Sequence, residues 1–140
     1  MKKLLVALIV AAALVGCAPA VVQVEAQVAD SIAVGANAAL PVLVSEYRQE
    51  GLTAIAASAS RTDAETKLTA IKAAWAPRWK AWETFRVAQD AWATALEKGG
   101  DLTAGLAALQ TAYCGLIGVW PSEIPAMPAV PLQCPKGAAP

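Results

Sequence analysis

Apolar positions recur at steps of three and four along much of the chain, which is the spacing of amphipathic helices. The longest stripe comprises Leu68, Ile71, Trp75, Arg78, Trp82, Phe85, Gln89, Trp92 and Leu96. The run Thr62-Asp63-Ala64-Glu65 predicts a capping box at its start, and Lys98-Gly99-Gly100 predicts its end. Pro77 predicts either a kink or a junction between two helices, and because the stripe keeps its phase across it we expect one kinked helix.

A second stripe follows after a short connection. Asp101 is suited to be the N-cap, and the stripe comprises Leu102, Leu106, Leu109, Tyr113, Leu116 and Trp120. Pro121 is expected to end this helix, because its ring disfavours helical backbone at the preceding residue. The short connection predicts two antiparallel helices whose stripes face each other.

The region before residue 60 has a weaker helical pattern, interrupted by Gly35, Pro41 and Gly51. We expect a helix that starts near Pro41, since proline is tolerated in a first turn. Apolar and polar residues alternate over residues 22–27, which also fits a short strand, but such a strand would have no partner. The predicted fold is all-α, a small antiparallel helical hairpin or three-helix bundle over residues 41–120. Six of the nine prolines fall in residues 121–140, which predicts an extended Pro-rich tail.

The N-terminus has the pattern of a secretory signal peptide. Lys2 and Lys3 precede an apolar run over residues 4–15, shorter than the roughly 20 residues needed to span a bilayer. The run ends in Leu14-Val15-Gly16-Cys17, which resembles the lipobox of bacterial lipoproteins. The resemblance implies that signal peptidase II removes residues 1–16 and that Cys17 carries the acyl chains, such as palmitate. An ordinary signal peptide, which would leave Cys17 as a free thiol, remains an alternative.

The same resemblance predicts the location of the protein. Two or more acyl chains anchor a protein stably to a membrane, so residues 17–40 would be the lipid-proximal segment. We expect a cell-envelope protein that faces the periplasm. Position 18 is alanine, and lipoproteins without aspartate at this place usually reach the outer membrane in enteric-type bacteria, so the outer membrane is favoured.

The two remaining cysteines, Cys114 and Cys134, form an even pair in a compartment where disulfides persist. A disulfide that closes this loop is expected to stabilise the fold by about 3 kcal/mol; two reduced thiols are the alternative. Two cysteines and no histidine leave a zinc site short of ligands, so we expect no metal and no cofactor.

Charge and composition narrow the function. Eleven basic and eleven acidic side chains give a net charge of zero, so no basic surface predicts a nucleic-acid partner. Without histidine there is no Ser-His or Cys-His pair, and we expect no catalytic residues and no enzyme. Glu46 and Glu50 could form a carboxylate pair, but a solvated polar face is the favoured interpretation.

Trp75, Trp79 and Trp82 lie on or beside the long stripe, with Arg78 and Arg86 close enough for cation–π contact. These five residues are a possible binding surface. The favoured interpretation is that the tryptophans, with Trp92, form the bulky side of a core that faces Ala-rich helices.

The sequence therefore predicts a lipid-anchored envelope protein with a structural or interaction role, whose partners are the membrane and an envelope protein. A short lipoprotein with a Pro-rich C-terminus also resembles the outer-membrane spanin subunit of phage lysis systems, although the long Trp-bearing helix departs from that pattern. A third possibility is a small-molecule binding module that uses the tryptophan stripe.

Overall fold

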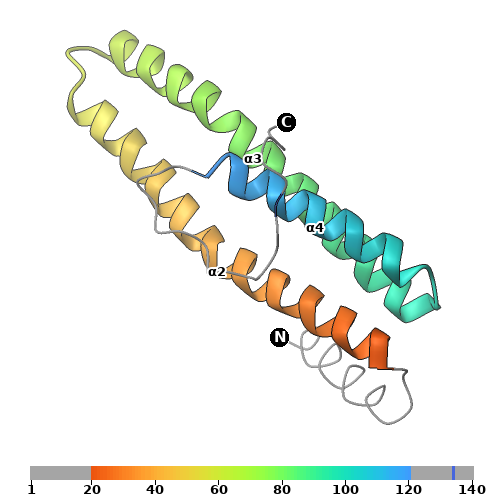
Figure 1. Ribbon diagram of the computed structural model, residues 1–140. Helices are drawn as coiled ribbons and strands as arrows, with labels where there is room; N and C mark the ends of the chain where they lie inside the picture. The colour runs from red at the N-terminus through yellow and green to blue at the C-terminus, as the bar shows by residue number, and fades with distance from the viewer. Residues whose placement is uncertain (1–19, 121–133, 135–140) are drawn as a thin grey trace.

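The computed structural model describes residues 20–120 and Cys134, and shows three helices packed as a bundle (Figure 1). They are α2 (Ala20–Ala56), α3 (Arg61–Lys98) and α4 (Leu102–Gly118). The described residues contain no strand, so the all-α prediction is confirmed and the three-helix alternative is the correct one. The expected signal peptide, lipobox and extended tail, Cys134 apart, lie outside the described residues.

Helix α2 is continuous, and the prediction of a helix that starts near Pro41 is wrong. The residues that hold it together are buried at steps of three and four: Ala29, Ile32, Ala36, Ala39 and Leu43. This packing begins well before residue 41 and outweighs the local cost of proline. Pro41 itself lies on the exposed side, as does Asn37, whose carbonyl loses its helical partner at the proline. The segment considered as a strand, 22–27, is also helical.

Helix α3 begins two residues earlier than the predicted Thr62 capping box. Ser60 has extended backbone angles, and its hydroxyl accepts a hydrogen bond from the Asp63 amide at 3.2 Å. The carboxylate of Asp63 in turn accepts from the Ala59 amide at 3.0 Å. The reciprocal bonding of a capping box is therefore present, but with Ser60 and Asp63 in the two roles. Glu65 instead pairs with Arg61.

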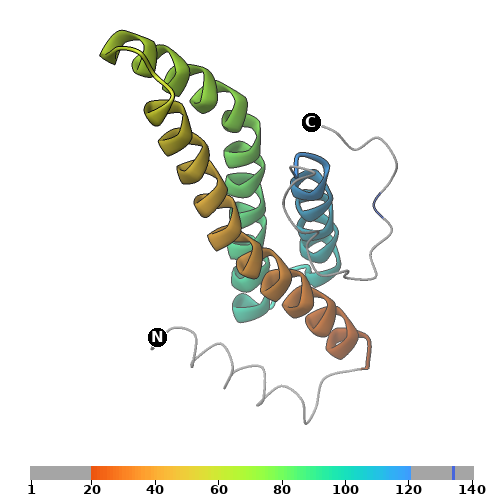
Figure 2. The ribbon, with the colours of Figure 1, turned by 90° about the vertical axis from the view of Figure 1, so that its left-hand side faces the viewer.

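The end of α3 and the start of α4 agree with the sequence. Gly99 has φ of 71° and caps α3, and the Asp101 carboxylate caps α4 by accepting from the Ala104 amide at 2.9 Å. Helix α4 ends at Gly118, slightly before the expected end at Trp120. Helix α3 runs unbroken through Pro77 and bends in its middle, as Figure 2 shows, so the prediction of one kinked helix is confirmed.

The core lies where all three helices meet. Its largest fully buried side chains are Ile32, Leu43, Phe85, Leu109, Tyr113 and Leu116. The small residues of α2 face bulky residues of α3 and α4, and this combination lets the helices approach closely. At one end of the bundle, the Thr103 hydroxyl donates to the Glu25 carboxylate at 3.1 Å, which places the start of α2 beside the start of α4.

The helices differ in length, with 37, 38 and 17 residues in α2, α3 and α4. In Figures 1 and 2, α4 lies along the N-terminal half of α2 and the C-terminal half of α3. The other halves extend beyond α4 as a two-helix hairpin. We call residues 47–75 of this hairpin the arm.

Candidate interaction surface

The base of the arm is held by an aromatic cluster around Trp75, which is 3% exposed. The Trp75 ring lies 5.5 Å from that of Tyr47 and 5.9 Å from that of Trp79, centroid to centroid. Its indole Nε1 donates a 2.6 Å hydrogen bond to Glu50 Oε2. The guanidinium of Arg78 lies 4.5 Å above the same ring, a cation–π contact. This cluster joins α2 to α3.

The five residues of the possible tryptophan surface do not form one exposed site. Trp75 and Trp82 are buried in the core, as is Trp92, so these rings have the structural role that the sequence favoured. Trp79 is partly buried against the core and Arg78 is stacked on Trp75. Arg86 is exposed.

Glu50 has a role that its sequence neighbourhood does not reveal. The sequence favours a solvated face for Glu46 and Glu50, and both residues are exposed. Nevertheless Glu50 accepts the hydrogen bond of a buried indole from a residue 25 positions later in the chain. Contacts this distant in sequence leave no local pattern, so sequence reasoning missed this one.

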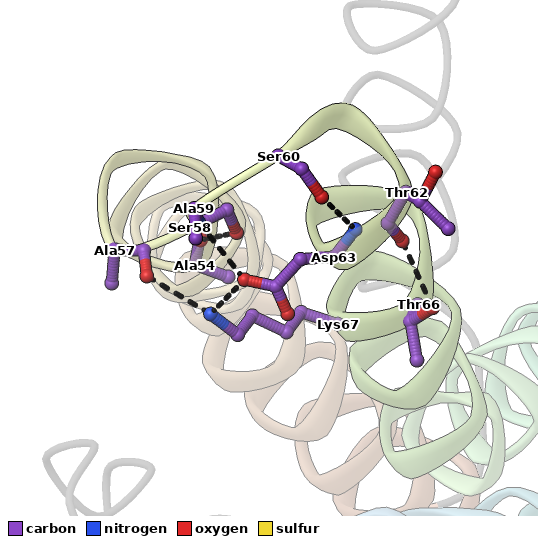
Figure 3. Close-up of polar contacts among 9 residues, drawn as sticks. All are labelled: Ala54, Ala57, Ser58, Ala59, Ser60, Thr62, Asp63, Thr66 and Lys67. Carbon is purple, nitrogen blue, oxygen red and sulfur yellow. Dashed lines mark hydrogen bonds and ion pairs between the residues drawn. The ribbon is translucent and has the colours of Figure 1, made fainter.

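The tip of the arm is a short turn fixed by polar contacts (Figure 3). The Lys67 ammonium donates to the Ala57 carbonyl at 2.9 Å and to Asp63 Oδ2 at 2.8 Å. The Ser58 hydroxyl donates to the Ala54 carbonyl at 2.6 Å. The hydrogen bond from Lys67, followed by that from the Ala59 amide, lowers the pKa of Asp63 below its usual value of 3.8. These contacts hold α2 and α3 in a defined arrangement at the tip.

Between the base and the tip, the two helices of the arm leave an open groove of about 370 Å³, which we call the arm groove. It is lined by Tyr47, Arg48, Gly51, Leu52, Ile55, Leu68, Thr69, Ile71 and Lys72. Leu52 is 56% exposed and Ile55 49% exposed, although both are large apolar residues. The apolar pattern of the sequence does not predict this surface. A partial signal for it was present, since the helix predicted over residues 102–120 is much shorter than the one predicted over residues 62–98.

Cys114 and Cys134 are joined by a disulfide with Cα atoms 5.4 Å apart, which is the pair that the sequence predicted. Cys114 lies on the buried side of α4. The bond fixes Cys134 to α4 and joins two positions 20 residues apart in the sequence.

Two further features bear on chemistry and location. Within residues 20–120 and Cys134, no group of three or more His, Cys, Asp or Glu side chains is arranged to hold a metal ion. Residues Val24–Ala56 of α2 form the one helical stretch of the described chain that is long and apolar enough to cross a membrane, by length and composition alone. About a third of its most apolar window is buried inside the bundle, and core helices of soluble proteins meet the same criterion.

No protein-family model, curated protein or solved structure matches this chain.

Proposed function

We propose that the protein is a lipid-anchored cell-envelope protein whose helical bundle faces the periplasm and acts by binding another envelope component, without catalysis. The observation that carries the proposal is the N-terminal sequence. A basic start, an apolar run and Leu14-Val15-Gly16-Cys17 stand in the order found in bacterial lipoproteins.

The disulfide supports a periplasmic location. Cys114 and Cys134 are bonded, and such bonds persist in oxidising spaces such as the periplasm but are rare in the cytosol. An apolar helix near the N-terminus is also compatible with an envelope location. The absence of aspartate at position 18 favours the outer membrane.

The surface supports an interaction role. The arm exposes large apolar side chains between two helices that the aromatic cluster and the polar tip hold in place. Exposed apolar grooves of this kind are typical of protein-binding surfaces. The chain contains no histidine for acid–base chemistry near neutral pH, which favours binding over catalysis.

The anchor is tested by Cys17→Ser in the full chain, expressed in a bacterium with a metabolic palmitate label. We expect the variant to lose the label and to leave the membrane fraction. The matched control is the Cys114→Ser/Cys134→Ser double variant, which should keep label and membrane association because Cys17 is intact. A Cys17→Ser protein that remains labelled and membrane-bound would refute the anchor.

Delivery of the protein to the outer membrane is tested separately with Ala18→Asp. If the outer membrane is the destination, the wild-type chain should sediment with outer membranes in a density gradient and this variant should shift to the inner membrane. Identical distribution of the two proteins would contradict the sorting proposal without affecting the anchor.

A further inference from the structure

The arm groove has the form of a three-helix bundle that lacks its third helix. In the other half of the molecule, α4 packs against α2 and α3 and buries their apolar faces. Beyond the end of α4, the same two helices leave Leu52 and Ile55 exposed beside the half-buried Leu68 and Ile71. A helix is the element that fills the equivalent position elsewhere in this fold.

Gly51 opens the floor of the groove. A glycine inside a helix costs roughly 0.5–1 kcal/mol relative to alanine. Gly51 does not have the positive φ that would require glycine, and a Cβ built there would meet only Leu68 Cδ2, at 3.6 Å, an ordinary contact. The fold could therefore accommodate a side chain at this position. Because Gly51 has no side chain, room remains between α2 and α3 for an inserted group.

The charge around the groove is positive. Its lining includes Arg48 and Lys72, one from each helix, and no carboxylate. Both cations are exposed, and neither has an ion pair or hydrogen bond within the described part of the chain. The three carboxylates within the arm, those of Glu50, Asp63 and Glu65, are each bonded to another group. An apolar occupant with negative charge along its edges would complement this surface.

We propose that the arm groove binds an amphipathic helix of a partner protein, with an apolar stripe against Leu52, Ile55 and Ile71 and acidic side chains facing Arg48 and Lys72. The bound helix would complete a three-helix bundle over the arm, in the helix-in-groove mode of recognition. A partner helix makes the interaction role proposed above more specific, and this inference rests on that role.

Charge argues against a second copy of this chain as the occupant. Pairing two arm grooves would bring four cations to the contact, and the groove lining supplies no carboxylate to balance them. Position argues against an anionic lipid. Helix α2 begins three residues after Cys17 and is about 55 Å long at 1.5 Å per residue, so the arm lies at the end remote from the proposed anchor.

The test uses the chain from Ala18 to Pro140, which contains every described residue and needs no lipid. The probes are two fluorescent 17-residue amphipathic peptides, the length of α4. They share one leucine stripe and differ only in having Glu or Lys along its edges. Fluorescence anisotropy should show saturable binding of the Glu peptide and about tenfold or weaker binding of the Lys peptide, with the difference reduced by salt.

Variants locate the site. Leu52→Gln/Ile55→Gln should weaken binding of the Glu peptide by about tenfold or more, while Val34→Gln/Val87→Gln, exposed valines outside the groove, should leave it unchanged. Arg48→Glu/Lys72→Glu should reverse the preference between the peptides. Circular dichroism of each variant checks that the helices are intact.

The proposal is overturned by no saturable binding, by equal binding of both peptides, by equal loss in the two Gln double variants, or by cosedimentation of the chain with phosphatidylglycerol vesicles that Leu52→Gln/Ile55→Gln abolishes. A peptide-free chain that sediments as a dimer lost on Leu52→Gln/Ile55→Gln would assign the groove to a second copy instead. Because the protein used carries no lipid, these outcomes are independent of the Cys17 experiments, and failure of the anchor leaves the binding result intact.

Discussion

The indole Nε1 of Trp75 on α3 donates a 2.6 Å hydrogen bond to Oε2 of Glu50 on α2, and this is the polar link between the two long helices at the base of the arm. Trp75 is buried, so its N–H depends on this acceptor. A hydrogen bond to a charged group contributes about 1.5–3 kcal/mol. The link therefore stabilises the hairpin in addition to the apolar contacts of the ring.

Replacing Glu50 tests this link. Glu50→Ala leaves the buried indole N–H without its acceptor and should lower the free energy of unfolding by about 1–3 kcal/mol. Glu50→Gln keeps an oxygen acceptor and should lose less. Urea unfolding followed by circular dichroism measures both, with Glu46→Ala, an exposed carboxylate one turn away, as the control. Equal stabilities of the Glu46 and Glu50 alanine variants would show that the hydrogen bond contributes nothing.

Two helical glycines in different surroundings should respond to alanine to different extents. Gly51→Ala adds a Cβ that meets Leu68 Cδ2 at an ordinary 3.6 Å, so the gain in helix propensity should raise the free energy of unfolding by about 0.5–1 kcal/mol. At Gly105 the added Cβ would lie 3.2 Å from Cε3 of the buried Trp92 ring, which has little room to move. Gly105→Ala should therefore give less stability than Gly51→Ala, measured by urea unfolding. The reverse order would contradict the packing at both sites.

The sequence predicted the features that depend on local pattern. The stripe from Leu68 to Leu96 and the caps at Gly99 and Asp101 are local, because their residues lie within a few turns of one another. The continuation of α2 through Pro41 was not predictable in this way. It depends on Ile32 and Ala36 packing against residues more than 40 positions later in the chain.

At the candidate site, too, local features could be predicted from the sequence and contacts between helices could not. The tryptophans could be assigned to the core from their spacing, whereas the bond between Glu50 and Trp75 requires knowledge of which helix faces which. The arm groove depends on the register of α2 against α3 and on where α4 ends. The capping error at Ser60 has a different cause, since Ser60-Arg61-Thr62-Asp63 and Thr62-Asp63-Ala64-Glu65 both fit the capping pattern and local sequence does not choose between them.

The disulfide should contribute to stability by cross-linking the chain. Cys134→Ala removes the bond without changing a helix, and should lower the free energy of unfolding by about 3 kcal/mol, the value for a loop of this size. Dithiothreitol should have a similar effect on the wild-type chain and none on the variant. Both are measured on the chain from Ala18 to Pro140, in which Cys114 and Cys134 are the only cysteines. A variant as stable as the oxidised wild type would show that the cross-link adds no stability.

Acid should weaken the tip of the arm through Asp63. Its folded-state pKa lies below its usual value because Lys67 and the Ala59 amide donate hydrogen bonds to the carboxylate. For an acid whose pKa is lowered by folding, the stabilisation is present above the unfolded-state pKa and is lost as pH falls through the folded-state pKa. Below a pH of about 4, the free energy of unfolding of the wild-type chain should therefore fall more steeply than that of Asp63→Asn. Urea titrations from neutral to acid pH measure the two slopes, with Glu83→Gln, an exposed carboxylate elsewhere on α3, as a control that should follow the wild type. Parallel profiles for wild type and Asp63→Asn would mean that the contacts of Asp63 at the tip do not favour its charged form.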